Sequence, residues 1–326
     1  MKRELIEEVS EFERRRVEEL LARTPRLSER WPALYPVSVW VHRARRRLQW
    51  WLRPSRWATR RASESLPVRI SQHSSLLRRQ LGADEVDLQD NKIVNLRLAS
   101  AHVDALLIRP GETFSFNRTV GNCTARKGYV TGMRLQNGDA ISGIGGGICQ
   151  LGNLIHWLAL HSDLTVVERS EHSFDPFPDK GRVLPWGTGV SIVYNYVDLV
   201  LRNDTDTTFQ LSMTVGDTYL EGELRADRPQ PRSYKVYAAR ERFFHAHGEY
   251  FRTNQLRRRV IDKATGEQIG DELVRENCAL VKYLPPTSTS STSPPEPAAR
   301  EKSEEASSVI CASPYRAGFQ RGRSPG

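Results

Sequence analysis

The chain has 326 residues, of which 38% are hydrophobic and 27% charged, with 48 Lys and Arg against 39 Asp and Glu. This length builds a core without disulfides or structural metals. No uninterrupted apolar run approaches the roughly 18 residues of a transmembrane helix, so the sequence excludes a membrane-spanning protein. The N-terminal MKRELIEEVSEFERRR lacks the apolar stretch of a secretory signal. Four widely separated cysteines favour reduced thiols, and we expect a cytoplasmic location.

The first predicted element is a charged helix over residues 1–23, which ends before Pro25. Most of the net positive charge follows it. Residues 31–61 contain eight arginines, no acidic residue and five of the seven tryptophans. A second helix is predicted from about residue 37 to Pro54, with one apolar face formed by Val37, Val41, Ala44, Leu48 and Trp51. This pattern is typical of a basic amphipathic helix.

Two functions fit this basic helix. Through residues 37–57 it could lie on the anionic inner leaflet of a membrane, because arginine and tryptophan favour that interface. Alternatively, it could pack its tryptophan face on the main domain and leave its arginines in solvent. No nucleic-acid partner is predicted, since no recognition motif follows.

From residue 62 the composition is that of a globular domain. We predict a helix over 92–107, a short strand over 111–117, a loop-rich passage and an apolar helix over 149–161. Strands are predicted over 165–173, 189–203, 209–215 and 219–226, the last two forming a hairpin. More strand-like sequence over 234–283 is expected to cover the end of the same sheet.

These elements predict an α+β fold in which a cysteine-bearing helix packs on a mainly antiparallel sheet, after N-terminal helices. We divide the chain into a helical N-terminal region (1–61), a core (62–228), a β-rich extension (229–285) and a tail (286–326). The tail is rich in Pro, Ser and Thr and poor in large apolar residues, so it is predicted to be disordered.

The sequence GIGGGIC places Cys149 at the start of the apolar helix, after Gly145, Gly146 and Gly147. A thiol at a helix N-terminus has a lowered pKa and can act as a nucleophile. The glycines allow close approach of a substrate, and the N–H groups of Cys149 and Gln150 could face an oxyanion.

His172, at the end of the strand after the cysteine helix, is the candidate base, and Asp198 on the following strand would orient it. Transglutaminase-like and papain-like hydrolases have the same chain order: a cysteine at a helix start, a histidine on the next strand and an aspartate on the strand after it. A core of that type is therefore one possibility. Each residue also has a structural interpretation. Cys149 could be a small buried hydrophobe, His172 a loop histidine, and Asp198 a turn cap or a partner of Arg202.

Metal binding is not predicted. Cys149 and His156 share a helix face but are about 10 Å apart along the axis, too far to ligate one ion. No cofactor is predicted either, because the glycine run lacks the frame of a phosphate-binding loop.

Four motifs occur in an order that resembles the VanW family, named for an accessory protein of vancomycin-resistance clusters. They are PGETFSFN (110–117), GGGICQ (145–150), LTVVERSEHS (164–173) and VDLVLRNDT (197–205). The resemblance covers roughly residues 68–284 and implies a link to peptidoglycan or glycopeptide resistance, without supplying a reaction. Many members carry Gly-x-Asp-Ala-Thr where this chain has Gly187-Thr188-Gly189-Val190-Ser191, which leaves Asp198 as the candidate orienting acid.

Two functional hypotheses follow. The first is a cysteine-dependent acyltransferase or amidohydrolase acting on a peptidoglycan-related substrate through Cys149, His172 and Asp198. The second is a non-catalytic accessory module that binds a peptidoglycan precursor, a cell-wall peptide or a protein. In that case Cys149 is inert and Arg134, Trp186 and Tyr196 line an open groove.

Overall fold

A computed structural model describes residues 9–22, 31, 33, 35–52, 56–78, 86–136, 139–170, 174–175, 178–179 and 182–285. Its helices are α1 (Glu11–Leu21), α3 (Tyr35–Leu52), α4 (Val86–Ala101), α5 (Phe116–Val120), the 3-10 turn η3 (Ala125–Lys127) and α6 (Cys149–Leu160). Within this described part of the chain, no helix is both long and apolar enough to cross a bilayer. The tail predicted for 286–326 lies outside the described residues, and the division of the chain into four parts stays a prediction.

The strands form three four-stranded sheets and one hairpin. Their orders are β1-β4-β9-β7, β2-β11-β10-β3, β12-β13-β14-β8 and β5-β6. Only the β1–β4 and β14–β8 pairs are parallel among the described strands, which confirms the α+β class with mainly antiparallel sheets. The strand bounds are β1 (Arg56–Trp57), β2 (Val68–Leu76), β3 (Leu106–Ile108), β4 (Glu112–Ser115), β5 (Thr131–Gln136), β6 (Asp139–Ile144), β7 (Thr165–Glu168), β8 (Phe174–Asp175), β9 (Val200–Arg202), β10 (Phe209–Val215), β11 (Tyr219–Ala226), β12 (Arg232–Ala246), β13 (Glu249–Asp262) and β14 (Gln268–Val281).

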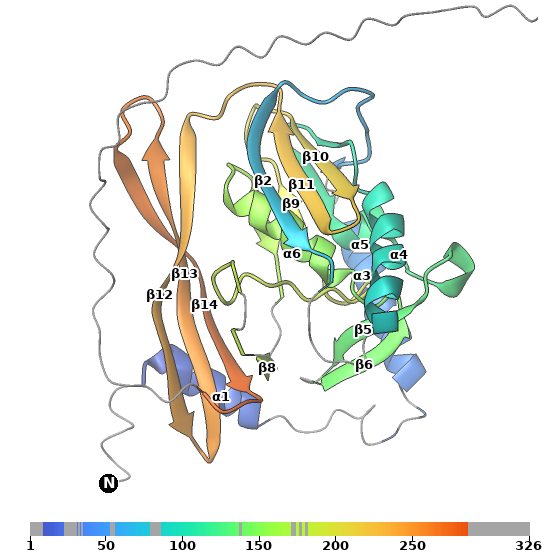
Figure 1. The fold of residues 1–326 in the computed structure, drawn as a ribbon, viewed down its shortest axis with the longest axis vertical. Helices are drawn as coiled ribbons and strands as arrows, with labels where there is room; N and C mark the ends of the chain where they lie inside the picture. Colours follow the sequence, from blue (N-terminus) through green and yellow to red (C-terminus); the bar gives the residue numbers. More distant parts are fainter. Residues whose placement is uncertain are drawn as a thin grey trace, which may run out of the picture. The chain divides into compact units, whose positions relative to one another are not determined.

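The helix α6 packs on the β2-β11-β10-β3 sheet, as the sequence predicts (Figure 1). Gly222 on β11 allows this close approach, since a Cβ atom built there would lie 2.8 Å from Leu154 Cδ2. The Ser71 hydroxyl on β2 donates to the Leu158 carbonyl at 3.0 Å. Apolar side chains from α4, α6 and the same sheet complete one buried core, which includes Leu96, Ile155 and Phe209.

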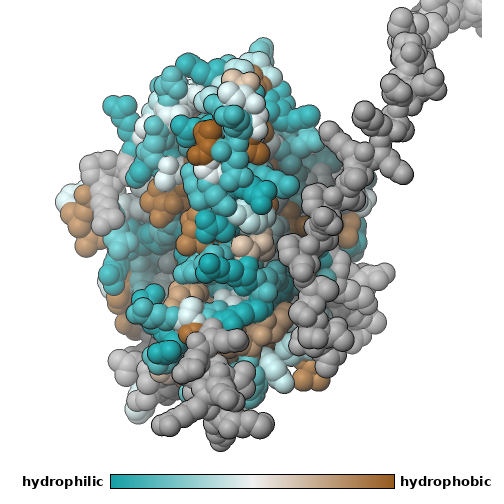
Figure 2. Space-filling model, turned by 90° about the vertical axis from the view of Figure 1, so that its left-hand side faces the viewer, coloured by the Kyte–Doolittle hydropathy of each residue, from teal (hydrophilic) through white to brown (hydrophobic). Residues whose placement is uncertain are grey.

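Strands β12, β13 and β14 form a long twisted antiparallel sheet with its own small core (Figure 1). The helix α1 packs against it, where Val17, Phe251 and Cys278 are buried together. The strand-like sequence predicted over 234–283 therefore forms a sheet that is separate from the preceding one. Strand β13 pairs with both β12 and β14, and β14 also pairs with β8. The face in Figure 2 is mostly hydrophilic, with apolar residues in small separate groups.

Three predicted elements differ in extent. The helix predicted over 92–107 ends at Ala101, and Leu106 and Ile108 instead form β3 against β10, where both side chains are buried. The strand predicted over 189–203 is regular only at β9. The passage predicted as loops contains the β5–β6 hairpin. For β3 and β9 a pairing partner distant in sequence decides the local structure, whereas β5 and β6 are neighbours in the chain and pair with each other.

Candidate functional site

Cys149 is the first residue of α6 and follows a tight turn of glycines. Gly145 and Gly147 have φ angles of +75° and +91°, which residues with a side chain rarely adopt. Gly146 abuts Gly132 on β5, since a Cβ atom built on Gly146 would lie 2.1 Å from the Gly132 carbonyl carbon. Turn geometry and packing against β5 therefore account for the three glycines without a ligand.

Asn95, a fully buried residue of α4, holds this turn in place. Its side-chain amide donates to the carbonyls of Gly146 at 2.9 Å and Val130 at 3.0 Å, and its oxygen accepts from the Val130 N–H at 2.9 Å. The sequence analysis missed this residue. A single amide on the otherwise apolar face of the predicted helix was the available signal, because a buried amide needs partners.

A cleft of about 1630 Å³ opens beside the start of α6. Its lining brings together most of the residues that the sequence singled out: Arg134, Gly145, Gly147, Cys149, Gln150 and Trp186. Gly146 lies behind the turn, against β5. Tyr196 is outside the lining and packs on His42 of α3, with ring centroids 4.5 Å apart. His172 lies outside the described residues, so its place relative to Cys149 stays a prediction.

The described lining of the cleft is strongly cationic. It contains the six basic residues Arg43, Arg78, Lys92, Arg134, Arg169 and Arg182 but a single carboxylate, Asp175. Asp175 is itself buried and engaged by Arg252, at 3.1 Å, and by the Tyr283 hydroxyl, at 2.9 Å. Arg134 is exposed and makes no ion pair with the described residues. Two of the six cations are paired with carboxylates outside the described lining, Arg78 with Asp90 and Arg182 with Asp179. The remaining positive charge favours an anionic ligand.

The Cys149 thiol lies 4.0 Å from the Ile192 carbonyl oxygen. Burial raises its pKa, and the hydrogen bond to Ile192 and the charge of Arg134 offset this only in part. The sequence-based expectation of a lowered thiol pKa is therefore wrong for this arrangement, because desolvation outweighs the helix N-terminus.

The backbone N–H and the side-chain amide of Gln150 bind other parts of the protein. Its backbone N–H donates to the Gly147 carbonyl at 3.1 Å, so this donor is not directed at an oxyanion as the sequence suggested. Its side-chain amide donates to the Ser75 hydroxyl and the Leu76 carbonyl, both at 2.9 Å. These bonds tie the start of α6 to the end of β2 and shape one wall of the cleft.

Asp198 is fully buried and does not line the cleft. Its carboxylate accepts from the Ser115 hydroxyl at 2.6 Å and from the backbone N–H groups of Asn117 and Leu199, both at 2.9 Å. Burial raises its pKa to about 6. The alternative pairing with Arg202 is not formed, since Arg202 binds Asp204.

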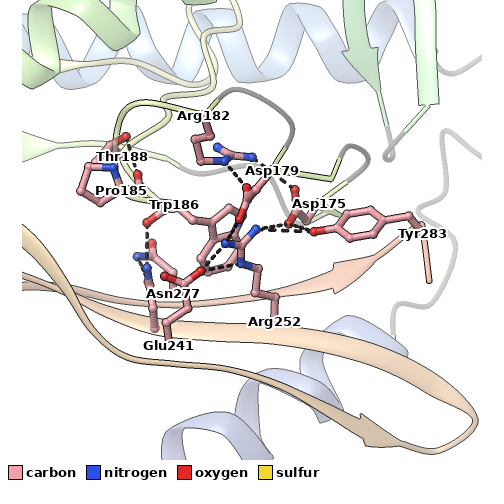
Figure 3. A network of polar contacts seen from close by, with 11 residues as sticks. Asp175, Asp179, Arg182, Pro185, Trp186, Thr188, Glu241, Arg252, Asn277 and Tyr283 are labelled. Carbon is pink, nitrogen blue, oxygen red and sulfur yellow. Dashed lines mark hydrogen bonds and ion pairs between the residues drawn. The ribbon is translucent and has the colours of Figure 1, made fainter. Parts of the chain in front are cut away.

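The opposite wall is held by a network around Arg252 of β13 (Figure 3). Its guanidinium is buried, binds Asp175, Asp179 and Glu241, and lies 4.9 Å from the centre of the Trp186 ring. The Asn254 amide also donates to the Trp186 carbonyl at 2.8 Å. Trp186 is thus a rigid part of the wall that the β12–β14 sheet supports.

Sequence comparison agrees with the resemblance noted above. The family described as VanW like protein matches residues 91–225. The vancomycin B-type resistance protein VanW of Enterococcus faecalis is 34% identical over 200 residues, which cover 61% of this chain and 73% of that protein.

The chain belongs to the VanW family. The uncharacterized protein YoaR of Bacillus subtilis is also similar, with 34% identity over 96 residues, or 28% of this chain and 32% of YoaR. No solved structure matches the chain, so a transglutaminase-like or papain-like core stays a prediction.

Two of the VanW motifs meet in the fold. Asp198, from VDLVLRNDT, accepts hydrogen bonds from Ser115 and Asn117 of PGETFSFN. Asn203 of VDLVLRNDT makes two further bonds: its backbone carbonyl accepts from the Gly111 N–H of PGETFSFN at 2.9 Å, and its buried amide donates at 2.8 Å to the carbonyl of Ile108, which precedes that motif. These motif residues join β4 to β9 and support the core.

Gly189, the position where the resemblance to the VanW family implies an acid in many members, lines the cleft. A Cβ atom built there has one neighbour within 4 Å, Asn153 Oδ1 at 3.9 Å, so the position has room for a Cβ atom. The Gly189 carbonyl accepts from Arg169 at 2.8 Å. Position 189 of this chain therefore has no side chain that could supply a carboxylate to the cleft.

Proposed function

We propose that this protein contributes to vancomycin resistance by binding an anionic peptidoglycan precursor or cell-wall peptide in its cleft. The observation that carries this proposal is the convergence of Arg134, Gly145, Cys149 and Trp186 on a cleft with six basic residues and one engaged carboxylate. The resistance association rests on the similarity to the VanW protein of Enterococcus faecalis.

Arg134 is the residue best suited to receive the ligand. It is exposed at the cleft, and Arg guanidinium groups bind carboxylates and phosphates through two parallel hydrogen bonds. Cell-wall peptides end in a carboxylate, and activated precursors carry phosphates. Either group would supply the negative charge that the described lining lacks.

A binding experiment tests this function. The full chain is titrated calorimetrically with a cell-wall peptide that has a free C-terminal carboxylate and with its C-terminal amide. Arg134→Gln should weaken binding of the acid by about 10- to 100-fold, as expected for one charged hydrogen-bonding partner. Arg126→Gln, an exposed arginine outside the described cleft lining, should bind as the wild type does.

Equal affinity for acid and amide, or an unaffected Arg134→Gln variant, would contradict the proposal for a carboxylate ligand. A phosphorylated precursor is then titrated in the same way. Failure of both ligands leaves no support for an anion-binding cleft. Deleting the gene and measuring vancomycin susceptibility tests the resistance association separately.

Cysteine-dependent acyl transfer or amide hydrolysis is a second candidate, favoured by the position of Cys149 at the cleft and at a helix start. In this reaction the thiolate attacks the carbonyl carbon and forms a thioester, while His172 protonates the leaving amine. Water or an acceptor amine then attacks the thioester and releases the thiolate. Asp198 would orient His172 only by exchanging its bonds to Ser115 and Asn117.

Iodoacetamide labelling separates the two candidates. Because burial raises the thiol pKa, the binding function predicts that Cys149 reacts more slowly than a free cysteine at neutral pH, as measured by mass spectrometry of the labelled peptide. The reaction should accelerate as the pH rises. A fast adduct at Cys149 that is lost in Cys149→Ala would instead support the enzyme.

A further inference from the structure

The helix α3 turns its apolar face to solvent along its whole length. Trp40 and Trp51 are 68% and 78% exposed. Other exposed apolar residues of α3 are Val37, Val41, Leu48 and Leu52. With 3.6 residues per turn, these six positions fall on one side of the helix. An apolar stripe of this kind is unusual on a water-facing helix and marks an interaction surface.

The opposite face of α3 is attached to the domain. Arg46 forms an ion pair with Glu168 on β7, and the rings of His42 and Tyr196 are in edge contact. Trp50 contacts Trp57, with ring centroids 6.2 Å apart. The sequence alternative in which the apolar tryptophan face packs on the domain is therefore wrong. Among the described tryptophans of α3, Trp50 alone lies on the attached side of the helix, the side that also carries the Arg46–Glu168 ion pair.

Basic residues border the stripe. Arg45 and Arg47 are exposed and, by helical geometry, lie on its two sides. The sequence from residue 31 to 61 contains no acidic residue, so no carboxylate of this segment neutralises them. An apolar strip with interfacial tryptophans between two exposed arginines is complementary to a bilayer with anionic headgroups.

We propose that α3 docks on the surface of an anionic lipid bilayer, with Trp40 and Trp51 inserted at the headgroup level. A second copy of the chain fits this surface less well, since two identical faces would bring Arg45 and Arg47 against the same cations. The proposal does not depend on the proposed cleft ligand. However, Arg43 of α3 lines the cleft, so docking holds the cleft within about one helix diameter, about 10 Å, of the headgroups.

Vesicle flotation with the full chain tests the docking. The protein should bind phosphatidylcholine vesicles that contain phosphatidylglycerol, bind pure phosphatidylcholine more weakly, and dissociate partly at high salt. The double variant Trp40→Ser/Trp51→Ser should reduce the partition coefficient at least about tenfold. Arg45→Gln/Arg47→Gln should reduce it by about tenfold or more on anionic vesicles only.

Matched control variants replace the same types of residue outside α3. Ile269→Ser/Leu273→Ser removes two exposed apolar residues of β14, and Arg97→Gln/Arg126→Gln removes two exposed arginines outside α3. Both controls should bind vesicles as the wild type does, and all variants should keep the wild-type melting temperature. Absence of vesicle binding, or binding that the α3 variants do not weaken, would overturn the proposal. A dimer that the tryptophan variant dissociates, without vesicle binding, would assign the face to a second copy instead.

Discussion

Arg46 on α3 and Glu168 on β7, 122 residues apart in the chain, form a two-point ion pair in which Arg46 Nη1 lies 2.7 Å from Glu168 Oε2. The Arg46 side chain is largely buried by this contact, whereas its neighbours Arg45 and Arg47 are exposed. The hydrogen bond to Glu168 raises the pKa of Arg46. One arginine of the basic helix thus attaches α3 to the domain, and this attachment orients the apolar face outward.

Replacing Arg46 tests this attachment. Arg46→Gln should lower the free energy of unfolding by about 1–2 kcal/mol, because Glu168 loses a charged partner while keeping some access to water. Urea denaturation measures the change. Arg45→Gln serves as the control and should stay within about 0.5 kcal/mol of the wild type. Equal effects of the two variants would mean that α3 is not held by the Arg46 ion pair.

The Arg252 network should be a major source of stability for the cleft wall. The side chains of Arg252 and Asp175 are 3% and 4% exposed, so Arg252→Met leaves the buried Asp175 carboxylate with only the longer ion pair to Arg182, at 3.8 Å. We expect a loss of about 3–5 kcal/mol, measured by denaturant unfolding. Arg228→Met removes an exposed ion pair with Asp206 and should cost at most about 1 kcal/mol. A similar small cost for Arg252→Met would contradict the role of this network.

The buried Asp198 should make stability depend on pH in an unusual direction. Its pKa is raised from 3.8 to about 6 by burial, so between these values the folded state retains a proton that the unfolded state has released. Its contribution to stability therefore falls as the pH rises from about 4 to 6, by at most about 3 kcal/mol.

Asp198→Asn removes this titration while keeping an oxygen that accepts from Asn117 and Leu199. The difference in unfolding free energy between wild type and variant should change across pH 4–6 and level off above it. Carboxylates with lowered pKa values, such as Asp179 and Glu223, make stability rise with pH. Their contribution is the same in wild type and variant, so it cancels when one unfolding free energy is subtracted from the other. A pH-independent difference would show that Asp198 is charged throughout.

The glycine turn offers a paired test of packing. Gly146→Ala places a methyl group 2.1 Å from the Gly132 carbonyl carbon, and neither backbone can yield easily. We expect a loss of at least about 3 kcal/mol. Gly189→Ala meets no atom closer than 3.9 Å and should stay within about 1 kcal/mol. Thermal melts of both variants provide the comparison, and a wild-type melt for Gly146→Ala would contradict the packing of the turn on β5.

Local sequence patterns predict the elements whose partners are close in the chain. The hairpin of residues 209–226 and the helix beginning at Cys149 follow directly from alternation and from helical spacing. The same reasoning extends the 92–107 helix too far, because Leu106 and Ile108 pair with Leu211 and Phe209 on β10. A helical spacing of leucines does not contain that long-range pairing.

The candidate site also has features that local sequence patterns predict and features that they do not. The residue types around Cys149 and the order of the motifs are properties of the sequence, and they led to the family and to six residues of the described cleft lining. The assembly of the cleft depends on Asn95, Arg252 and other residues far from the motifs. Their contribution is a matter of three-dimensional packing, which spacing along the chain does not reveal.

The amino-acid sequence alone determined the family, the α+β class, the basic amphipathic helix and the residues next to Cys149 in the chain. Only the tertiary structure decided which face of α3 is covered and whether the Cys149 pKa rises or falls. Both outcomes depend on burial by segments more than 40 residues away, such as Glu168 for α3 and Ile192 for Cys149. Burial is a property of the folded chain, and desolvation can reverse what a local motif favours.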